Sequence, residues 1–460
     1  MMPFVLSLIY LLYLSLICQT LFIYDSIGYE RLGERMLHHG LITYIQNGPE
    51  REPLYILVIA AAMRLAEVFS LDARWALKLL QIALLAATQI LAFFILKGLR
   101  VNGWCRSLAV LYIGISPALV NSALWVYSEI AALPLVLAAV LASAKAWADI
   151  HGHAGRARLA VNGTAAGTAL ALCMFVKGIF EMIAPLLMLP FVLLAMRALR
   201  KDLPRTAGRA MLVVMCCAAA FYIPVTAYKY ANLKLNGHFT FTDRGAWALY
   251  GNTARRVEPL TVPRLKAALA YIPSPHLCYV VMDQGNCDFW SYKPSDNYGR
   301  TKLQELYNNG TPKDRIDPEL MRLSVGKAME HPLQYAFLAF LETLKMLFWE
   351  TSKAGQVMYP DWVDHVYHQP WFDPALVTVT ALLSLWGLVY LTRTCWRNRD
   401  QLHLPAGSYS SALALFLLLM LLAYAFAHSF FFVLQRYSLP AAPLWVIAAA
   451  FRLRSLRQKI

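Results

Sequence analysis

The feature that most constrains this chain is a series of apolar stretches, each of roughly the length needed to cross a lipid bilayer. About ten of them recur along the sequence. They lie near residues 3–24, 75–96, 107–127, 131–148, 159–177, 182–199, 210–229, 374–392, 411–434 and 438–452. Runs of this length with few charges are typical of transmembrane helices. The sequence therefore predicts an all-α polytopic membrane protein.

Composition and charge placement agree with a membrane protein. The chain is 59% hydrophobic and 15% charged, with a mean hydropathy of +0.48, whereas soluble domains are about half apolar and a quarter charged. The net charge of +15 would raise the question of nucleic acid in a soluble protein. Here most Lys and Arg residues stand in short runs between apolar stretches, as the positive-inside rule expects. The charge therefore indicates topology, and no nucleic-acid partner is expected.

Two shorter apolar segments, residues 53–69 and 332–349, carry Arg64, or Glu342 and Lys345, in their middle. If neither segment crosses the membrane, the Lys and Arg runs fall on one face, which must be cytoplasmic. A charge in the middle of a spanning helix also costs about 2.5 to 3.5 kcal/mol on insertion scales. We therefore expect both segments to be helices in the outer interface, and both termini to be cytoplasmic.

This topology divides the chain into three parts. Residues 1–229 form an N-terminal transmembrane catalytic module with a first outer loop over 25–74, and residues 374–460 form the C-terminal transmembrane helices. Residues 230–373 form a soluble domain on the outer face together with an interfacial helix. Gly, Pro, Asn and Asp punctuate this middle part, which indicates a small α/β or loop-rich domain. Cys278 and Cys287 share it and are a candidate disulfide if it faces an oxidising compartment.

Four ionisable residues stand at the ends of predicted spans on the outer face, namely Asp25, Glu129, Lys177 and Arg436. Ionisable groups at membrane depth are functional candidates by default. Each also has a structural alternative. Asp25 and Glu129 favour helix N-termini, Lys177 and Glu181 have the spacing of an intrahelical pair, and Arg436 has the reach to snorkel toward head groups.

A weak metal motif and several absent motifs complete the inventory of polar residues. Asp361, Asp364, His365 and His368 have a D-x-x-D-H-x-x-H spacing, which is looser than that of zinc sites, so a polar interfacial loop is the favoured interpretation. No P-loop, dinucleotide fingerprint, hydrolase elbow or zinc-protease helix is present. No cofactor is therefore assigned, and a divalent metal is not indicated.

The first polar stretch contains an ordered set of motif residues. An acid follows the first span, a Tyr lies four residues on, and the segments ERMLHHG and EREPLY follow. The positions concerned are Asp25, Tyr29, Met36, Leu37, Gly40, Arg51 and Pro53. This pattern resembles the first outer loop of the GT-C glycosyltransferases, particularly the branch with the lipid A aminoarabinose transferase and the protein O-mannosyltransferases.

Further matches to that family lie in other parts of the chain. The family's T-K-G segment resembles FVKGIF, which contains Lys177. Its second outer acidic turn resembles YSEIAALPL, which contains Glu129. The Y-x-x-P-x-x-P opening of its closing span is similar to QRYSLPAAP, which contains Arg436. Two positions depart from the pattern, because Ser26 replaces a second acid and Glu52 replaces the lysine of the K-P element. Arg51, one position before Glu52, is the residue that would supply the cation of this element.

The resemblance implies a fold and a reaction. The expected fold is a GT-C-like bundle of about 10 to 12 transmembrane helices. The expected donor is a polyprenyl-phosphate monosaccharide, undecaprenyl phosphate in a bacterial inner membrane, and the acceptor is lipid A, a polysaccharide or a protein at a periplasmic site. The transfer would invert the anomeric carbon. The expected site comprises catalytic Asp25 and Glu129, phosphate-binding Arg51, Lys177 and Arg436, and substrate-positioning Tyr29, Tyr55 and Tyr437.

Two other functions stay open at this stage. A secondary transporter or lipid flippase would use Lys177 and Glu181 on its substrate path; it predicts two related halves with broken helices, and no such pairing is visible. A lipid-linked polysaccharide ligase or polymerase of related fold would transfer a whole glycan.

Overall fold

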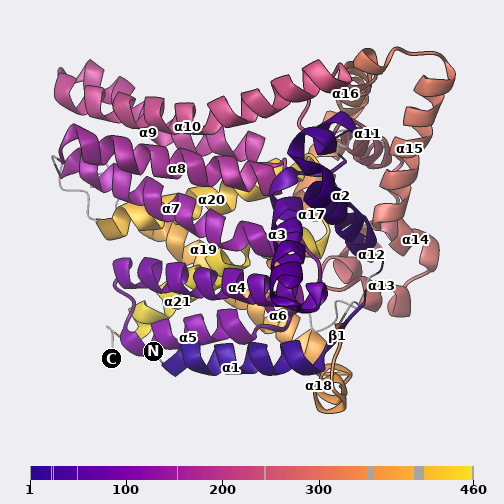
Figure 1. The fold of residues 1–460 in the computed structure, drawn as a ribbon, viewed down its shortest axis with the longest axis horizontal. Coiled ribbons are helices and arrows are strands. Elements are labelled where there is room, and N and C mark those ends of the chain that lie inside the picture. The colour runs from indigo at the N-terminus through magenta and orange to yellow at the C-terminus, as the bar shows by residue number, and fades with distance from the viewer. Residues whose placement is uncertain are drawn as a thin grey trace.

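The computed structural model describes residues 2–21, 23, 25–48, 50–152, 154–242, 245–350, 357–397 and 409–457. These residues are almost entirely helical (Figure 1). In the described part of the chain the one sheet is a short antiparallel pair, β1 (Gln19–Thr20) with β2 (Val357–Met358), in which Gln19 faces Met358. The prediction of an all-α polytopic membrane protein is confirmed.

Seven of the described helices are long and apolar enough to cross a membrane. They are α4 (Ala73–Gly98), α7 (Glu129–His151), α8 (Arg156–Val176), α9 (Phe180–Arg200), α10 (Pro204–Asn236), α19 (Phe372–Arg397) and α20 (Tyr409–Ser429). An eighth span is formed if α5 (Gly103–Ile115) and α6 (Pro117–Leu124) count as one, bent by 45°. The bend falls where Pro117 starts α6, since proline cannot continue the helical hydrogen bonds of α5.

The remaining two apolar stretches form shorter helices than expected. α1 (Met2–Ile17) and α21 (Ala442–Arg457) have 16 residues each, so they fall below the spanning length of the seven helices above. α1 ends early because the chain enters β1. The stretch before α21 forms a 3-10 helix instead, η3 (Gln435–Ala441), which contains Pro440. The expectation of about ten full spans is therefore too high for the part of the chain that the structure describes.

Helices α2 (Asp25–Gln46) and α3 (Pro53–Phe69) lie across one end of the bundle and do not run along its long helices (Figure 1). Gly40, with φ of 75°, bends α2, a backbone conformation that favours glycine. α3 starts with Pro53 and ends before Ser70, whose backbone is left-handed. Its mid-helix Arg64 pairs with Glu67 at 2.7 Å. As predicted, α3 is not among the spanning helices.

The region between α10 and α19 is a group of short helices. They are α11 (Gly245–Arg256), α12 (Val262–Tyr271), α13 (Pro275–Val281), α14 (Gln284–Phe289), α15 (Tyr292–Asn308), α16 (Lys313–Glu330), α17 (Pro332–Thr343), η1 (Leu344–Leu347) and α18 (Asp361–Tyr367). The α/β or loop-rich expectation is wrong here. Its Ser and Asp punctuation marks helix starts, since Ser274 caps α13 and Asp283 caps α14. Cys278 and Cys287 are disulfide-bonded.

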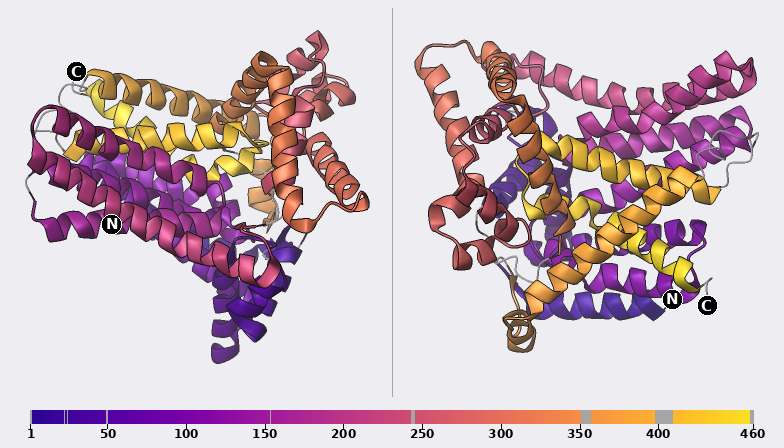
Figure 2. Two further views of the ribbon diagram at one scale, coloured as in Figure 1. Left: turned by 90° about the horizontal axis from the view of Figure 1, so that it is seen from above. Right: turned by 180° about the vertical axis from the view of Figure 1, so that it is seen from behind.

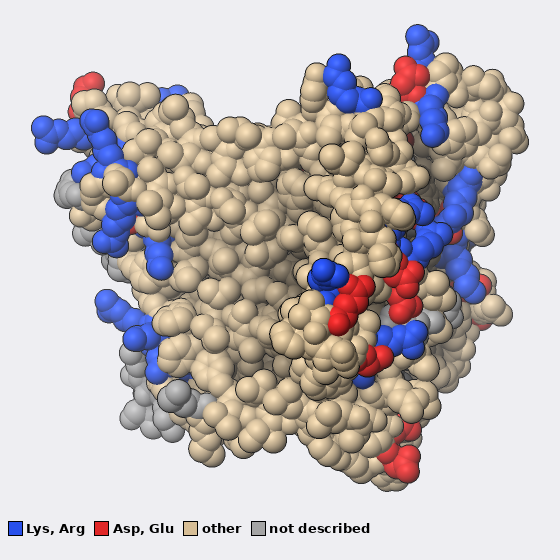
Figure 3. Space-filling model, in the orientation of Figure 1, with Lys and Arg blue, Asp and Glu red and all other residues tan. Residues whose placement is uncertain are grey.

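The molecule has two chemically different ends. On the face drawn in Figure 3, Lys and Arg predominate at one end of the bundle, both charge signs are mixed at the other, and the band between them shows no charged side chains. Both chain termini lie at the basic end (Figures 1 and 2). The short helices α11–α17 pack at the opposite end, as do α2 and α3 (Figure 2). The uncharged band is what a bilayer requires of the surface it covers.

Candidate active site

The first part of the site is an acid held by two arginines. Asp25 is the first residue of α2, where a carboxylate complements the helix dipole. Arg51 lies just before α3 and donates from Nη2 to Asp25 Oδ1 at 2.6 Å. Arg436, in η3, donates from Nη2 to Asp25 Oδ2 at 2.8 Å. The fold therefore brings residues from both ends of the sequence onto one carboxylate.

These contacts decide the charge state of Asp25. Partial burial of the carboxyl group would by itself raise its pKa, because it disfavours the charged form. The positive charges of Arg51 and Arg436 outweigh burial and lower the pKa of Asp25 to about 2. Asp25 is therefore ionised near neutral pH. A carboxylate with so low a pKa is a weak base for as long as both arginines hold it.

The second part of the site is a buried pair between Glu129 and Lys177. Glu129 opens α7, and its side chain is 3% exposed. Lys177 follows α8 in an extended backbone conformation, and its Nζ lies 2.9 Å from Glu129 Oε1. Glu52 Oε1 accepts a hydrogen bond from the backbone N–H of Gly178 at 2.9 Å. Glu52, which replaces the lysine of the expected K-P element, thus fixes the turn that carries Lys177.

The alternative pairing of Lys177 with Glu181 is wrong. Lys177 caps the end of α8, and Glu181 lies in the first turn of α9. Because the chain is not helical between them, a spacing of four residues does not bring the two side chains together. Glu181 pairs instead with Lys229 of α10.

Aromatic rings connect the two ion-paired groups. The guanidinium of Arg51 lies 5.0 Å from the centre of the Tyr29 ring, and the Tyr29 hydroxyl donates to Ser128 Oγ at 3.1 Å. The Tyr437 ring lies between two cations, with its centre 5.7 Å from Lys177 Nζ and 5.4 Å from the Arg436 guanidinium. Cations are attracted to ring faces at these distances.

Tyr55 has a different place from the other two predicted tyrosines. It is fully buried, and its hydroxyl donates to Gln81 Oε1 at 2.6 Å. Its ring packs edge-on against Tyr29, with the ring centres 5.1 Å apart. Tyr55 thus packs against Tyr29 on the side away from the cavity described below and helps to hold its ring in place.

A cavity of about 720 Å³ opens beside these residues. Its wall includes Tyr29, Arg51, Lys177 and Tyr437. The residues that line it do not include Asp25, Glu129 or Arg436. Asp25 therefore reaches the cavity wall through its partner Arg51, and Glu129 through its partner Lys177. Apolar side chains from three regions cover much of the remaining wall; they include Met174, Phe239, Phe241, Phe431 and Phe432. Cations beside an apolar surface suit an amphiphilic anion.

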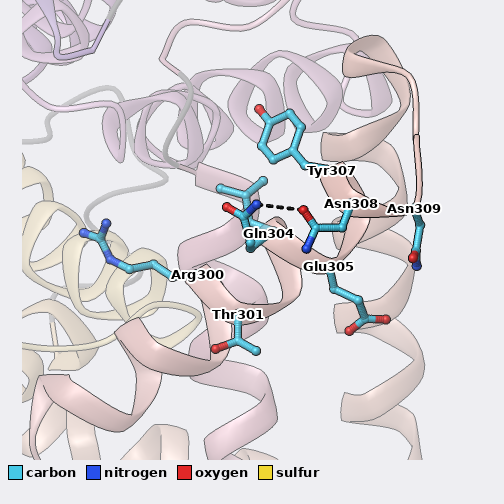
Figure 4. A pocket seen from close by; sticks show the side chains of 8 residues that line it. Arg300, Thr301, Gln304, Glu305, Tyr307, Asn308 and Asn309 are labelled. Carbon is cyan, nitrogen blue, oxygen red and sulfur yellow. Dashed lines mark hydrogen bonds between the residues drawn. The ribbon is translucent and has the colours of Figure 1, made fainter.

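A second cavity, of about 780 Å³, lies along α15 and contains none of the predicted site residues. Its walls are mostly polar side chains of one helix, such as Arg300, Glu305 and Asn309 (Figure 4). Gln304 Nε2 donates to Asn308 Oδ1 at 2.9 Å, as the dashed line marks. All its lining residues come from one stretch, 300–309, so this second cavity does not bring together side chains from distant parts of the chain.

The weak metal candidates lie on one short helix away from the cavity. Asp361, Asp364 and His365 belong to α18, and His368 follows it. His368 Nδ1 lies 3.0 Å from Asp364 Oδ2, and both side chains are exposed. Within the described ranges no group of three or more His, Cys, Asp or Glu side chains is arranged to hold a metal ion, so no step is assigned to one.

Sequence reasoning missed several residues of the cavity wall. Lys229 of α10, and Tyr424 and His428 of α20, all line the cavity. Tyr424 and His428 come at the end of an apolar run, where nothing in the local pattern separates them from residues that pack between helices.

Comparison with known proteins gives a limited result. No family model and no curated protein matches this chain. Two solved structures of an oligosaccharyltransferase from Archaeoglobus fulgidus do. The archaeal AglB structure with an inhibitory peptide and a dolichol-phosphate has 13% identity and a TM-score of 0.44, over 99% of this chain and 50% of that one. The structure tethered with an acceptor peptide that contains the NVT sequon has 15% sequence identity and a TM-score of 0.46, over 94% of this chain and 45% of that one. This chain thus spans about half the length of those proteins.

Proposed function

We propose that this protein is a GT-C-type membrane glycosyltransferase that moves a monosaccharide from a polyprenyl-phosphate donor to an acceptor at the outer membrane face. The observation that carries the proposal is the cavity whose wall combines Arg51 and Lys177 with apolar side chains, with the carboxylate of Asp25 bonded to Arg51. A polyprenyl phosphate has the matching parts, since it joins an anionic group to an apolar chain.

The reaction that these residues suit is a direct displacement. The acceptor hydroxyl or amine attacks the anomeric carbon, and the bond between that carbon and the phosphate oxygen breaks, with inversion. The acceptor proton passes to Asp25, and the negative charge stays on the departing lipid phosphate. Arg51, Arg436 and Lys177 then stabilise that phosphate by charge-assisted hydrogen bonds.

The arginines also connect donor binding to the strength of the base. Arg51 and Arg436 both donate to Asp25 in this structure, and a phosphate would compete for the same N–H groups. When the phosphate takes these bonds, Asp25 loses the contacts that depress its pKa and becomes a better base.

Glu129 has a supporting role in this scheme. It is buried behind Lys177, and it does not line the cavity as the structure describes it. We assign it the orientation of the Lys177 amine toward the donor phosphate, and an indirect part in acceptor placement.

The position of the site limits the donor class. Helix α2, which begins with Asp25, lies at the end of the bundle opposite the one where Lys and Arg predominate (Figures 1 and 3). By the positive-inside rule the basic end is cytoplasmic, which places the termini inside and the site outside, periplasmic in a bacterial inner membrane. Nucleotide sugars are cytoplasmic, so a lipid-linked sugar such as undecaprenyl-phosphate sugar is the fitting donor. Lipid A, a polysaccharide and a protein all stay within the acceptor class.

The test is transfer by the purified, lipid-reconstituted protein supplied with a labelled polyprenyl-phosphate sugar and envelope acceptors. Asp25→Asn should lower turnover about a hundredfold or more, because the amide cannot accept the acceptor proton. The same variant should bind polyprenyl phosphate at least as tightly as the wild type, because one negative charge near the phosphate is removed.

A matched control is Asp72→Asn. Asp72 is exposed and caps α4 through a bond from the Trp75 N–H at 2.8 Å, a role that asparagine also fills. Its transfer rate should equal that of the wild type. Wild-type turnover by Asp25→Asn would eliminate Asp25 as the base. Movement of the labelled lipid from one leaflet of the vesicle membrane to the other, without sugar transfer, would favour a flippase.

A further inference from the structure

His428, near the C-terminal end of α20, lines the cavity and has no part in the proposed mechanism. We propose that His428 is a phosphate ligand, whose ring N–H donates to the phosphate of the bound polyprenyl-phosphate donor. The inference rests on the proposed function for the class of ligand and adds a residue that sequence motifs do not indicate.

The bonding of His428 is unusual for a buried side chain. The residue is only 7% exposed. Neither Nδ1 nor Nε2 has a hydrogen-bond partner among the described residues. Buried polar groups are nearly always hydrogen-bonded, because leaving one unpaired forfeits its bonds with water. Both nitrogens of this imidazole are therefore available for a bond that the protein itself does not supply.

The other buried atoms without a partner do not share this location. In the part of the chain that the structure describes, buried side-chain N or O atoms without a hydrogen bond belong, besides His428, to Trp75, Arg106, Asn121, Ser122, Trp147, Arg436 and Trp445. Among the residues that own them, His428 is the one that lines the 720 Å³ cavity. An unpaired group in a cavity wall indicates a bound partner more directly than one that is packed between helices.

The neighbours of His428 point to the phosphate rather than to the lipid chain. Its ring stacks on Tyr437, with the ring centres 6.0 Å apart, and Lys177 Nζ lies 5.7 Å from the centre of the same Tyr437 ring. His428 and Lys177 therefore flank one aromatic side chain. Tyr424, whose ring centre is 4.6 Å from that of His428, already donates its hydroxyl to the Tyr437 carbonyl. The imidazole is thus the unused donor beside the cationic end of the cavity.

The test measures binding, not turnover, with the full-length protein in lipid nanodiscs. The probes are a short-chain polyprenyl phosphate and the matching polyprenyl alcohol. His428→Leu removes both ring nitrogens and should weaken binding of the phosphate about tenfold to a hundredfold, with binding of the alcohol unchanged. His428→Gln keeps an N–H donor near the same place and should stay within about threefold of the wild type. His276→Leu, at an exposed histidine of α13, should change neither affinity.

The possible results separate clearly. Wild-type phosphate affinity in His428→Leu would overturn the inference, and so would an equal loss for phosphate and alcohol, which would indicate packing alone. A wild-type protein that prefers the alcohol, or does not discriminate, would also overturn it. The proposed function is tested by a different experiment, the transfer assay. Wild-type transfer by Asp25→Asn would show that Asp25 is not the base, and it would not affect the finding that phosphate binding depends on His428.

Discussion

The acids and bases of the site are already paired before any ligand binds. Asp25 holds Arg51 and Arg436, and Glu129 holds Lys177. The two groups differ in burial, because the Asp25 side chain is 28% exposed and the Glu129 side chain is 3% exposed. Asp25 is therefore accessible enough for a ligand to replace it as the partner of its arginines. Glu129 and Lys177 are not expected to separate, since separation would leave the Glu129 carboxylate buried without a counter-charge or water.

This difference gives a prediction for Lys177→Met. The substitution leaves Glu129 as an unpaired buried carboxylate, which should lower the free energy of unfolding by about 3 to 5 kcal/mol. The double variant Glu129→Gln/Lys177→Met removes both charges and should recover most of that loss. Thermal unfolding of the detergent-purified proteins measures both effects.

A control for this experiment is Lys302→Met. It removes a pair with Glu305 whose carboxylate is 51% exposed, and exposed pairs contribute little to stability. If Lys177→Met and the double variant unfold at the same temperature, the pair does not stabilise the fold in the way argued here.

The sequence could predict which charged residues matter, but not how they pair. Asp25, Lys177 and Arg436 stand out because each interrupts or ends an apolar run. Their partners are 26, 48 and 411 residues away, distances over which no local period operates. His428 could not be predicted either, because its significance lies in bonds that it does not make.

At the level of helices, the group α11–α17 is tied to the bundle by a buried charge cluster. Arg255 and Arg256 end α11, and both bond to Glu342 of α17; all three side chains are fully buried. Arg256 also donates to the carbonyl oxygens of Ser429 and Phe431, which follow His428. The cluster therefore fixes the end of α20 where the cavity begins.

Removing the acid of this cluster should loosen that connection. Burial would raise the pKa of Glu342, but Arg255, Arg256 and Lys345 outweigh it and lower the pKa to about 2. Glu342→Gln leaves three cations without a carboxylate and should destabilise the protein by about 3 to 5 kcal/mol. Because the folded-state pKa is depressed, the contribution is fully present above the unfolded value near 4.5 and is lost as the pH falls toward 2.

Melting temperatures recorded between pH 4 and 8 check this prediction. The gap between wild type and Glu342→Gln should narrow as the pH falls from about 5 to 4. Glu319→Gln, which breaks an exposed pair with Arg322, should follow the wild type throughout. An equal loss in both variants would contradict a special role for the buried cluster.

The element boundaries show why this region was hard to predict. The spans follow from apolar length, and α3 follows from its short length and mid-helix charge. The helices α12 to α15 are preceded by the N-cap residues Thr261, Ser274, Asp283 and Ser291, whose side chains accept hydrogen bonds from backbone N–H groups. The same residue types mark loops and helix starts. Only the packing of each short helix on its neighbours distinguishes the two.

At the scale of the whole molecule, the unequal charge of the two ends sets the orientation in the membrane. The basic end carries both termini (Figures 1 and 3), and the other end carries the Cys278–Cys287 disulfide within its short helices. Disulfides persist in oxidising compartments, and Lys and Arg stay on the cytoplasmic side. Two independent principles therefore support the proposed orientation, in which the cavity faces outward.

Labelling with a membrane-impermeant maleimide tests this orientation. Two exposed lysines at opposite ends serve as sites: Lys313, the first residue of α16, and Lys201, after α9. Each is replaced by cysteine in a background without the free cysteines, with the disulfide retained. In intact cells Lys313→Cys should react, and Lys201→Cys should react only after permeabilisation. The background itself, which has the disulfide but no free cysteine, should stay unlabelled. The reverse pattern would place the cavity in the cytoplasm, where nucleotide sugars are present and the reason for a lipid-linked donor disappears.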